Sequence, residues 1–219
     1  MSVLEFRHAT LQGNLHHMKC LRSIQSEWDH TIFWFAAATG DIEILDWLFK
    51  EGCPLTKITF NYAKSVETLQ WLISKNIEWD THTFSNAVKT GNIQILEFLL
   101  EKKCPWSKET LTIAARHGDI DVVKWLCDNK CPYDHNTFSN SVIYGSMETI
   151  EYLLQYGCPF DIYTFEYAVL REDIDILTLL LKENCPISYG SIDTARRLKT
   201  NKILHWIIKN RIIEYEIVN

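Results

Sequence analysis

Two pairs of residues in this sequence have the types and spacing of metal ligands. Cys127 and Cys131 form a C-x-x-x-C, and His16 and Cys20 stand four residues apart, as two ligands on one helical face would. No second cysteine pair is spaced to complete a zinc site. We therefore interpret the cysteine pair as packing residues, and the His16 pair as polar residues of a terminal structural unit. The sequence predicts no metal and no other cofactor.

One histidine has acidic neighbours of the kind found in catalytic triads. His117 is followed closely by Asp119 and Asp121. No serine or cysteine is placed near them as a nucleophile, and the eight glycines are scattered and form no phosphate-binding loop. We therefore predict that the protein is not an enzyme.

Composition narrows the class of protein. Hydrophobic residues make up 47% of the 219 residues, enough to bury a core. The net charge of −6 argues against a nucleic-acid partner, which requires a basic surface. No apolar run reaches the ~18 residues of a membrane span, and the first residues do not resemble a secretory signal. Seven cysteines without such a signal indicate reduced thiols, and hence a cytoplasmic location with the nucleus as an alternative.

Cysteine and proline mark an internal repeat. Each of the five prolines follows a cysteine, and the same position recurs every 27 residues with one interval of 24. This position is occupied by Ser26, Cys53, Ile77, Cys104, Cys131, Cys158 and Cys185. The period predicts a single domain over residues 1–219 with units at about 1–25, 26–52, 53–76, 77–103, 104–130, 131–157, 158–184 and 185–211, and a tail at 212–219.

Each unit has the pattern of two helices. Counting the corner residue as the first position, the third position of each unit is large and apolar, and the fourth is a good N-cap: Asp29, Thr56, Asp80, Ser107, Asp134, Asp161 and Ser188. A large residue and a small one then follow at i and i+3, forming one helical stripe: Phe33/Ala36, Phe60/Ala63, Phe84/Ala87, Leu111/Ala114, Phe138/Ser141, Phe165/Ala168 and Ile192/Ala195.

Glycines and prolines mark the ends of these helices. Gly40, Gly91, Gly118 and Gly145 are predicted to end the first helix in the left-handed conformation. A second, mostly apolar helix follows, and it closes before Cys-Pro because proline cannot continue a helix. The cysteine is expected to be small and buried, with the next large residue filling the gap between units. In the 24-residue unit, from Cys53, we expect a tightened loop between the helices.

The segment "AARHGDIDVVKWL" resembles the ankyrin repeat. The positions that match the consensus of that family are Leu111, Ala114, Ala115, Gly118, Val122, Val123 and Leu126. Six residues are missing relative to the family's period of 33, at the place where ankyrins carry a β-hairpin finger. The resemblance implies an all-α solenoid of about eight antiparallel helix pairs without fingers. The Cys-Pro-Trp arrays are similar to repeat proteins of large DNA viruses of amoebae.

The resemblance also implies a function, as a module that binds a partner protein. In ankyrin-like arrays the first helices line the concave side, and the two positions after Ala-Ala face the partner. These positions vary in this chain while the core positions stay constant. From them we predict a partner-binding patch formed by Lys89, Arg116, His117, Ile143, Tyr144 and Arg171. Tyrosine and arginine are favoured anchors at protein interfaces.

An alternative function is structural. The last unit is basic between Arg196 and Arg211, and it is followed by the apolar segment "IIEYEIV". This end is either a solvated cap or a surface that assembles the protein into a particle or scaffold. We expect a monomer, with the tail folded over the last helix pair.

Overall fold

The computed structural model describes residues 3–24, 27–199, 201–210 and 212. Every element within these residues is an α-helix or a 3-10 helix, which confirms the predicted all-helical repeat fold. The predicted corner residue Ser26, the end of the basic segment at 211 and most of the predicted tail lie outside the described residues. The chain groups into two compact units, Met1–Trp106 and Ser107–Asn219, so the single domain expected from the sequence stays a prediction.

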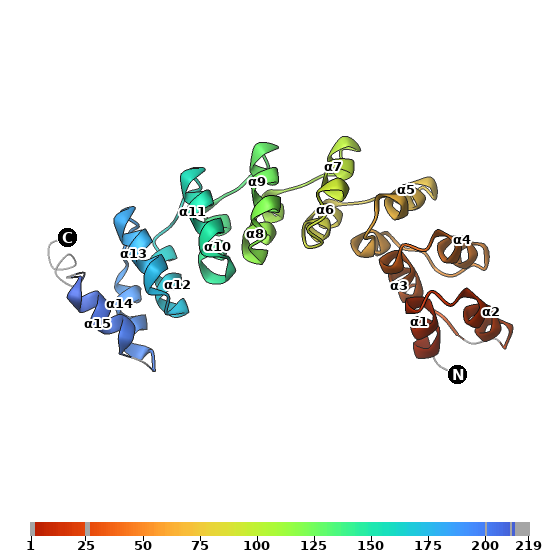
Figure 1. Ribbon diagram of the computed structural model, residues 1–219, viewed down its shortest axis with the longest axis horizontal. Coiled ribbons are helices and arrows are strands. Elements are labelled where there is room, and N and C mark those ends of the chain that lie inside the picture. Colours follow the sequence, from red (N-terminus) through yellow and green to blue (C-terminus); the bar gives the residue numbers. More distant parts are fainter. Residues whose placement is uncertain (1–2, 25–26, 200, 211, 213–219) are drawn as a thin grey trace. The chain divides into compact units, whose positions relative to one another are not determined.

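The first compact unit contains the N-terminal helix pairs (Figure 1). First and second helices alternate along the chain, and α1, α3, η1 and α6 contact one another in that order. The elements are α1 (Val3–Leu11), α2 (Leu15–Ser23), α3 (Thr31–Thr39), α4 (Ile42–Lys50), the 3-10 helix η1 (Lys57–Tyr62), α5 (Val66–Ser74), α6 (Thr81–Val88) and α7 (Ile93–Glu101).

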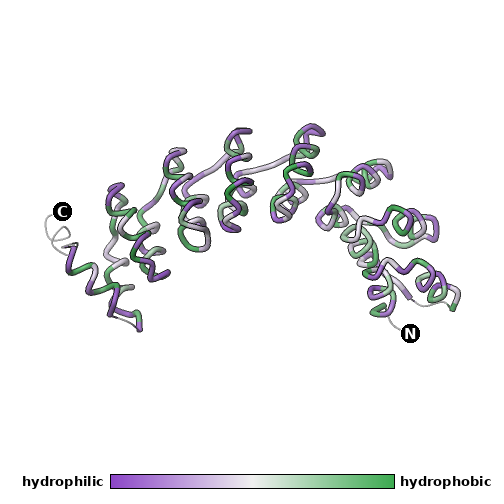
Figure 2. Tube along the Cα trace, in the orientation of Figure 1, coloured by the Kyte–Doolittle hydropathy of each residue, from purple (hydrophilic) through white to green (hydrophobic). Residues whose placement is uncertain are grey.

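The second compact unit repeats the same arrangement. Helices α8, α10, α12 and α14 pack against one another in sequence, and each also contacts the second helix of its own pair. Hydrophobic and hydrophilic residues alternate along these helices (Figure 2). The elements are α8 (Lys108–His117), α9 (Ile120–Asp128), α10 (His135–Tyr144), α11 (Met147–Gln155), α12 (Thr164–Arg171), α13 (Ile174–Lys182), α14 (Tyr189–Arg197) and α15 (Lys202–Lys209).

The core consists of the predicted large and small positions. All seven pairs of the stripe are buried, from Phe33/Ala36 to Ile192/Ala195. The small residue leaves room for the neighbouring first helix, so the stripe of one repeat packs against the next. Burial of a large apolar side chain stabilises the fold by about 1.5–3 kcal/mol relative to exposure.

The corners between repeats combine an aromatic contact with a left-handed residue. Trp79 lies 5.7 Å from Phe60 of the preceding repeat, and Phe160 lies 5.8 Å from Phe138, between ring centroids. This confirms that the corner residue fills the gap between helix pairs. The residue before the corner position, which is a cysteine in five repeats and Ile77 in the sixth, has a positive φ at Gly52, Asn76, Lys103, Lys130, Gly157 and Asn184.

The corner cysteines also form a contact that sequence reasoning missed. The Sγ atom of Cys158 donates to the backbone carbonyl of Asp134 at 3.6 Å, and Cys131 donates to that of Ser107 at 3.7 Å. Cys53 and Cys104 make the same contact, at 3.5 Å and 3.8 Å. The thiols of Cys104, Cys131 and Cys158 therefore connect a corner to the N-cap of the preceding repeat, and that of Cys53 connects to Asp29, the residue before the N-cap of α3.

The prediction that Gly145 is left-handed is wrong. Gly40, Gly91 and Gly118 have positive φ, whereas Gly145 has φ −77° and ψ 176°, an extended conformation. A Cβ at position 145 would lie 2.7 Å from the carbonyl oxygens of both Ala115 and Ser141. Glycine is required there because helices α8 and α10 approach each other closely.

The 24-residue repeat also differs from expectation. Its first helix is the six-residue 3-10 helix η1, so the shortening removes helix and not only loop. Ala63 and the next N-cap, Ser65, are two residues apart, whereas Ala87 and Asn92 in the following repeat are five apart. The final turn of the first helix is therefore missing from this repeat.

The predicted N-caps hold in part. Asp80, Ser107 and Asp134 cap α6, α8 and α10, each in a capping box with a threonine three residues on. Asp29 and Asp161 lie before the cap position and instead accept from the amides of Thr31 and Tyr163. Thr56 and Ser188 make no side-chain hydrogen bond to the amides of the helices that follow them, so the prediction that their side chains cap these helices is wrong.

Candidate partner-binding surface

The six predicted binding residues fall in both compact units. Lys89 belongs to the first unit, directly after α6, and is exposed. The remaining residues belong to the second unit and lie at the ends of its first helices: Arg116 and His117 on α8, Ile143 and Tyr144 on α10, and Arg171 on α12.

Arg116 and Tyr144 form a pair on the surface of the second unit. The Cζ atom of Arg116 lies 4.4 Å from the centroid of the Tyr144 ring, within cation–π range. Both side chains are exposed, Tyr144 to 55%. No ion pair of Arg116 occurs among the described residues, so its guanidinium donors are held over the ring and available to an acceptor.

Close packing of α8 and α10 keeps this pair in place. A Cβ on Gly145 would lie 2.7 Å from the carbonyl oxygens of Ala115 and Ser141, and a Cβ on Gly118 would lie 3.2 Å from the amide nitrogen of Ser146. The ends of the two helices therefore approach each other closely, with no room for a side chain at Gly145. Residues carried on such ends lose little conformational freedom when a partner binds.

Arg171 has a structural role that the sequence did not reveal. Its Nη1 donates to the carbonyl oxygens of Val142 and Gly145, both at 2.9 Å, and its Nε lies 3.7 Å from Asp173. The side chain therefore connects α12 to the end of α10 and has few donors left for a partner. Leu170, which precedes Arg171 in the sequence, is 55% exposed, whereas the Arg171 side chain is 28% exposed. Leu170 is therefore the more accessible of the two to a partner.

A groove runs beside the Arg116–Tyr144 pair. It has a volume of about 320 Å³ and is lined by residues of α8 and of the start of α10: Lys108, Glu109, Thr112, Ile113, Arg116, Asp134, Asn136 and Asn140. Sequence reasoning missed Ile113 and Asn140. The signal available was their position, six residues after the caps Ser107 and Asp134, on the first-helix face next to the buried stripe.

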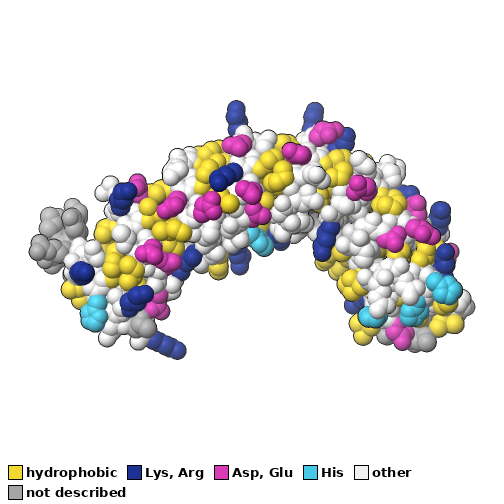
Figure 3. Space-filling view, in the orientation of Figure 1, with side chains coloured by type: hydrophobic (Ala, Val, Ile, Leu, Met, Phe, Trp, Pro, Cys, Tyr) yellow, Lys and Arg dark blue, Asp and Glu magenta, His cyan; other side chains and the backbone are white. Residues whose placement is uncertain are grey.

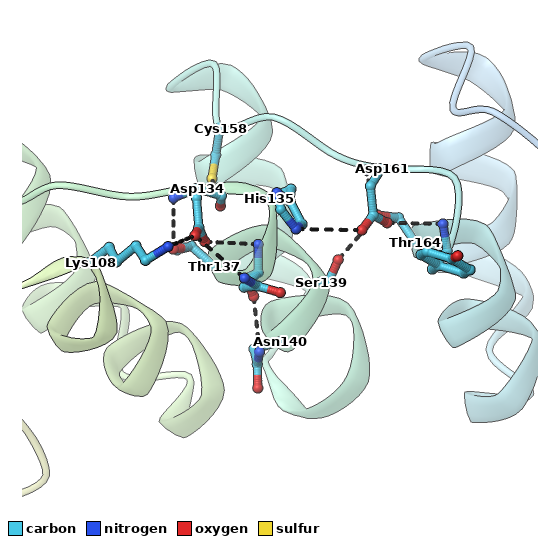
Figure 4. A network of polar contacts seen from close by, with 11 residues as sticks. Lys108, Asp134, His135, Thr137, Ser139, Asn140, Cys158, Asp161 and Thr164 are labelled. Atoms are coloured by element: carbon cyan, nitrogen blue, oxygen red, sulfur yellow. Dashed lines mark hydrogen bonds and ion pairs between the residues drawn. The ribbon is translucent and has the colours of Figure 1, made fainter.

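A network of polar contacts crosses the starts of α8, α10 and α12 (Figure 4). Lys108 Nζ donates to Asp134 at 2.6 Å, and His135 Nε2 lies 3.9 Å from Asp161. In each case the residue after one cap reaches the cap-region aspartate of the next repeat. Ser139 and Thr164 add a contact between hydroxyl groups at 3.2 Å. The network connects neighbouring repeats at their polar edge.

Asp134 is the centre of this network, and its charge is stabilised there. Partial burial opposes ionisation of the carboxyl group. The hydrogen bond from Lys108 and the backbone amide of Asn136 outweigh burial, so the pKa of Asp134 lies below its ordinary value of 3.8. Asp134 is therefore ionised at neutral pH and is committed to the fold.

The residues with metal-ligand spacing are arranged as follows. Cys127 and Cys131 are buried free thiols, and Cys20 Sγ lies 3.9 Å from His16 Nε2 on the surface. Within the described residues, no three His, Cys, Asp or Glu side chains gather as a metal ion would need. Burial raises the pKa of six thiols to about 12, namely those of Cys53, Cys104, Cys127, Cys131, Cys158 and Cys185.

Asp119, one of the acidic neighbours that His117 has in the sequence, caps a helix. Asp119 is the N-cap of α9, and its Oδ1 accepts from the amides of Asp121 and Val122. His117 is exposed at the end of α8. The arrangement accounts for Asp119 by helix capping alone.

Charge is mixed over the surface. Acidic and basic side chains are interspersed on the face drawn in Figure 3. In the last repeat, Arg196 pairs with Asp193 at 3.0 Å, and Lys199, Lys202 and Lys209 are exposed. No helix among the described residues is long and apolar enough to cross a membrane.

Comparison with known proteins identifies the repeats. The sequence matches the family described as ankyrin repeats (3 copies) over residues 58–139 and 84–164. No protein of curated function matches it.

Two solved structures resemble the fold weakly. One is the pentatricopeptide repeat protein PPR10 in complex with an 18-nt psaJ RNA element, with 12% identity and a TM-score of 0.39. The other is a cysteine-to-serine variant of PPR10 with the same values. The match covers 93% of this chain but 43% of those chains, so this chain spans less than half of their length. The ankyrin match and the all-helical architecture agree with each other: the chain is a helical repeat protein, and residues 58–164 within it are ankyrin repeats.

Proposed function

We propose that this protein is a non-enzymatic module that binds a partner protein through the ends of the first helices in its second compact unit. Ankyrin repeats generally serve as protein–protein interaction modules, and the family is typically not enzymatic. Within this unit, the partner contacts Arg116, Tyr144 and the adjoining groove on α8.

The observation that carries this proposal is the exposed Arg116–Tyr144 pair. The fold does not require either side chain for its core, whereas Arg171 and Asp134 nearby are used by the structure itself. Arginine and tyrosine contribute disproportionately to binding energy at interfaces. The groove on α8 adds Ile113 and the amide of Asn140 as apolar and polar contacts. His117 and Ile143 extend the same surface, whereas Lys89 belongs to the first compact unit.

Affinity capture from the native cell tests the proposal. The bait carries Arg116→Glu together with Tyr144→Ala, which alters the pair without touching the buried stripe. A matched control is Tyr163→Ala with Lys182→Glu, because Tyr163 is 53% exposed and Lys182 is an exposed lysine of the same compact unit. We expect a protein that the wild type and control capture and the Arg116/Tyr144 variant does not.

Circular dichroism of the variants shows whether their folds are intact. Equal capture by all three baits would contradict this surface. Capture by none of them, from a cell that produces the protein, would contradict partner binding. The free thiols favour a cytoplasmic or nuclear location, so the capture is carried out with cytoplasmic and nuclear extracts.

The structural alternative rests on the last repeat. Ile208 on α15 is 53% exposed, next to exposed basic residues. Assembly through this end predicts a mass that rises with concentration in light scattering. A constant monomer mass, which we expect, would exclude it.

A further inference from the structure

The first compact unit contains a second groove, beside the shortened repeat. Its volume is about 540 Å³. It is lined only by polar residues: Asn61, Lys64, Asn86, Lys89, Thr90 and Asn92. These come from η1, the segment after it and the end of α6, all within the same unit.

The groove exists because the 24-residue repeat lacks the last turn of its first helix. Helix α6 continues to Val88 and is followed by Lys89 and Thr90, whereas η1 ends at Tyr62. The segment after η1 turns directly into α5, whose N-cap is Ser65, so this repeat has no helical turn beside the last turn of α6. Asn61 and Lys64 line the space that the missing turn would fill.

The charge in this groove is of one sign. Lys64 and Lys89 are exposed, and no acidic residue is among the lining residues. Neither lysine has an ion pair in the part of the chain that the structure describes. By contrast, the groove on α8 contains two acids beside its two bases. On a chain of net charge −6, this is a local positive site.

The ammonium group of Lys89 is also positioned. Its Nζ donates to Asn86 Oδ1 at 2.7 Å, and Asn86 Nδ2 donates in turn to the carbonyl oxygen of His82 at 2.9 Å. An ammonium group has three donors, so two remain for a ligand. A held cation forms charge-assisted hydrogen bonds with a smaller loss of side-chain freedom.

We infer that this groove binds an acidic segment of a partner protein in extended form, with its carboxylates on Lys64 and Lys89. The asparagine amides can both donate and accept, as a peptide backbone requires. Two cations without an aromatic residue are too few for the stacked, phosphate-tracking contacts that bind single-stranded nucleic acid. The groove is separate from the Arg116–Tyr144 surface, and the inference does not depend on it.

Fluorescence anisotropy with a defined probe tests this inference. The probe is a fluorescein-labelled oligoglutamate peptide, compared with oligoglutamine of the same length and with oligothymidylate of the same charge, at about 50 mM salt so that charge interactions are not fully screened. We expect oligoglutamate to bind in preference to both. Lys64→Glu and Lys89→Glu should each weaken binding about ten-fold or more, the value of one charge-assisted contact.

Two further variants sharpen the result. Lys50→Glu makes the same charge change on α4, away from the lining residues, and should leave the affinity within about two-fold, because isolated surface charges are screened. Asn86→Asp places a carboxylate inside the groove, at a half-buried position, and should abolish binding. Circular dichroism monitors the fold of each variant.

Three outcomes would overturn the inference. They are no binding of oligoglutamate, equal losses in the Lys50 and Lys89 variants, or oligothymidylate binding as tightly through the same lysines. Because the probe is synthetic and Arg116 is unchanged, these outcomes are independent of the capture experiment.

Discussion

The repeat at 53–76 and the repeat at 131–157 place the same stripe in the core but build different first helices. Phe60 and Ala63 are buried in one, as Phe138 and Ser141 are in the other. Both repeats also begin with a buried cysteine whose thiol donates to a carbonyl 24 residues earlier in the chain. The packing unit is thus the same in both repeats.

The two repeats differ at their polar edges. Asp134 caps α10 and joins the preceding repeat through Lys108, and α10 is an α-helix of ten residues. Thr56 makes no capping bond, and its hydroxyl and that of Thr59 are buried without a partner among the described residues. The element there is a 3-10 helix. The comparison indicates that the stripe keeps repeats stacked, while capping and length decide which helix forms.

The largest expected effect is on the shared stripe. Phe138→Ala should lower the free energy of unfolding by about 3–5 kcal/mol, because it leaves a cavity in packed surroundings. Phe60→Ala should fall in the same range if the two positions are equivalent. Chemical denaturation followed by circular dichroism measures both. A loss below about 1 kcal/mol for either residue, typical of surface sites, would break the equivalence.

The next effect separates two glycines of the 131–157 repeat. Gly145→Ala should cost about 1–3 kcal/mol, because its Cβ meets two carbonyl oxygens that can move only with their helices. Gly157→Asn transfers the residue found at the same corner of the 53–76 repeat, Asn76, and should cost less than about 0.5 kcal/mol. Thermal melting compares the two variants, and the reverse order would contradict the contact argument.

A smaller effect concerns the caps. Asp134→Ala should cost about 0.5–2 kcal/mol through loss of the N-cap. The corresponding change, Thr56→Ala, should be neutral or slightly stabilising, since it removes a buried hydroxyl without a partner. Chemical denaturation measures the stability of both variants. Equal losses of stability in the two would show that Thr56 caps its helix in solution.

The smallest effect depends on pH. The folded pKa of Asp134 is lowered, so its ionised form contributes stability above the ordinary pKa of 3.8 and loses that contribution as pH falls through the folded pKa. Asp134→Asn keeps a capping oxygen but has no charge. The difference in stability between wild type and Asp134→Asn should therefore be larger at pH 7 than below pH 3.8, as measured by urea unfolding at each pH. A difference in stability that does not change with pH would mean that the charge of Asp134 does not contribute to stability.

Much of this fold follows from periodicity in the sequence. The alternation of large and small residues locates the buried stripe at every repeat, because burial allows few side-chain types at those positions. The caps were predicted less well, because Thr56 and Asp134 have similar local sequence preferences and differ only in the length of the segment that follows.

Contacts between repeats were mostly not predictable. The bonds from Arg171 to the carbonyls of Val142 and Gly145 depend on the distance between two helix ends, which no local pattern encodes. The thiol contacts had a signal in the sequence, because the interval from Asp134 to Cys158 equals the interval from Ser107 to Cys131. The viral origin suggested by the Cys-Pro-Trp pattern stays a prediction.

Oxidative footprinting of the captured complex tests the central claim most directly. Tyr144 and Tyr163 are exposed to 55% and 53% in the same compact unit, so they react similarly in the free protein. The account predicts that the partner protects Tyr144 from oxidation while Tyr163 stays reactive. Protection of Tyr163 with Tyr144 unchanged would contradict it.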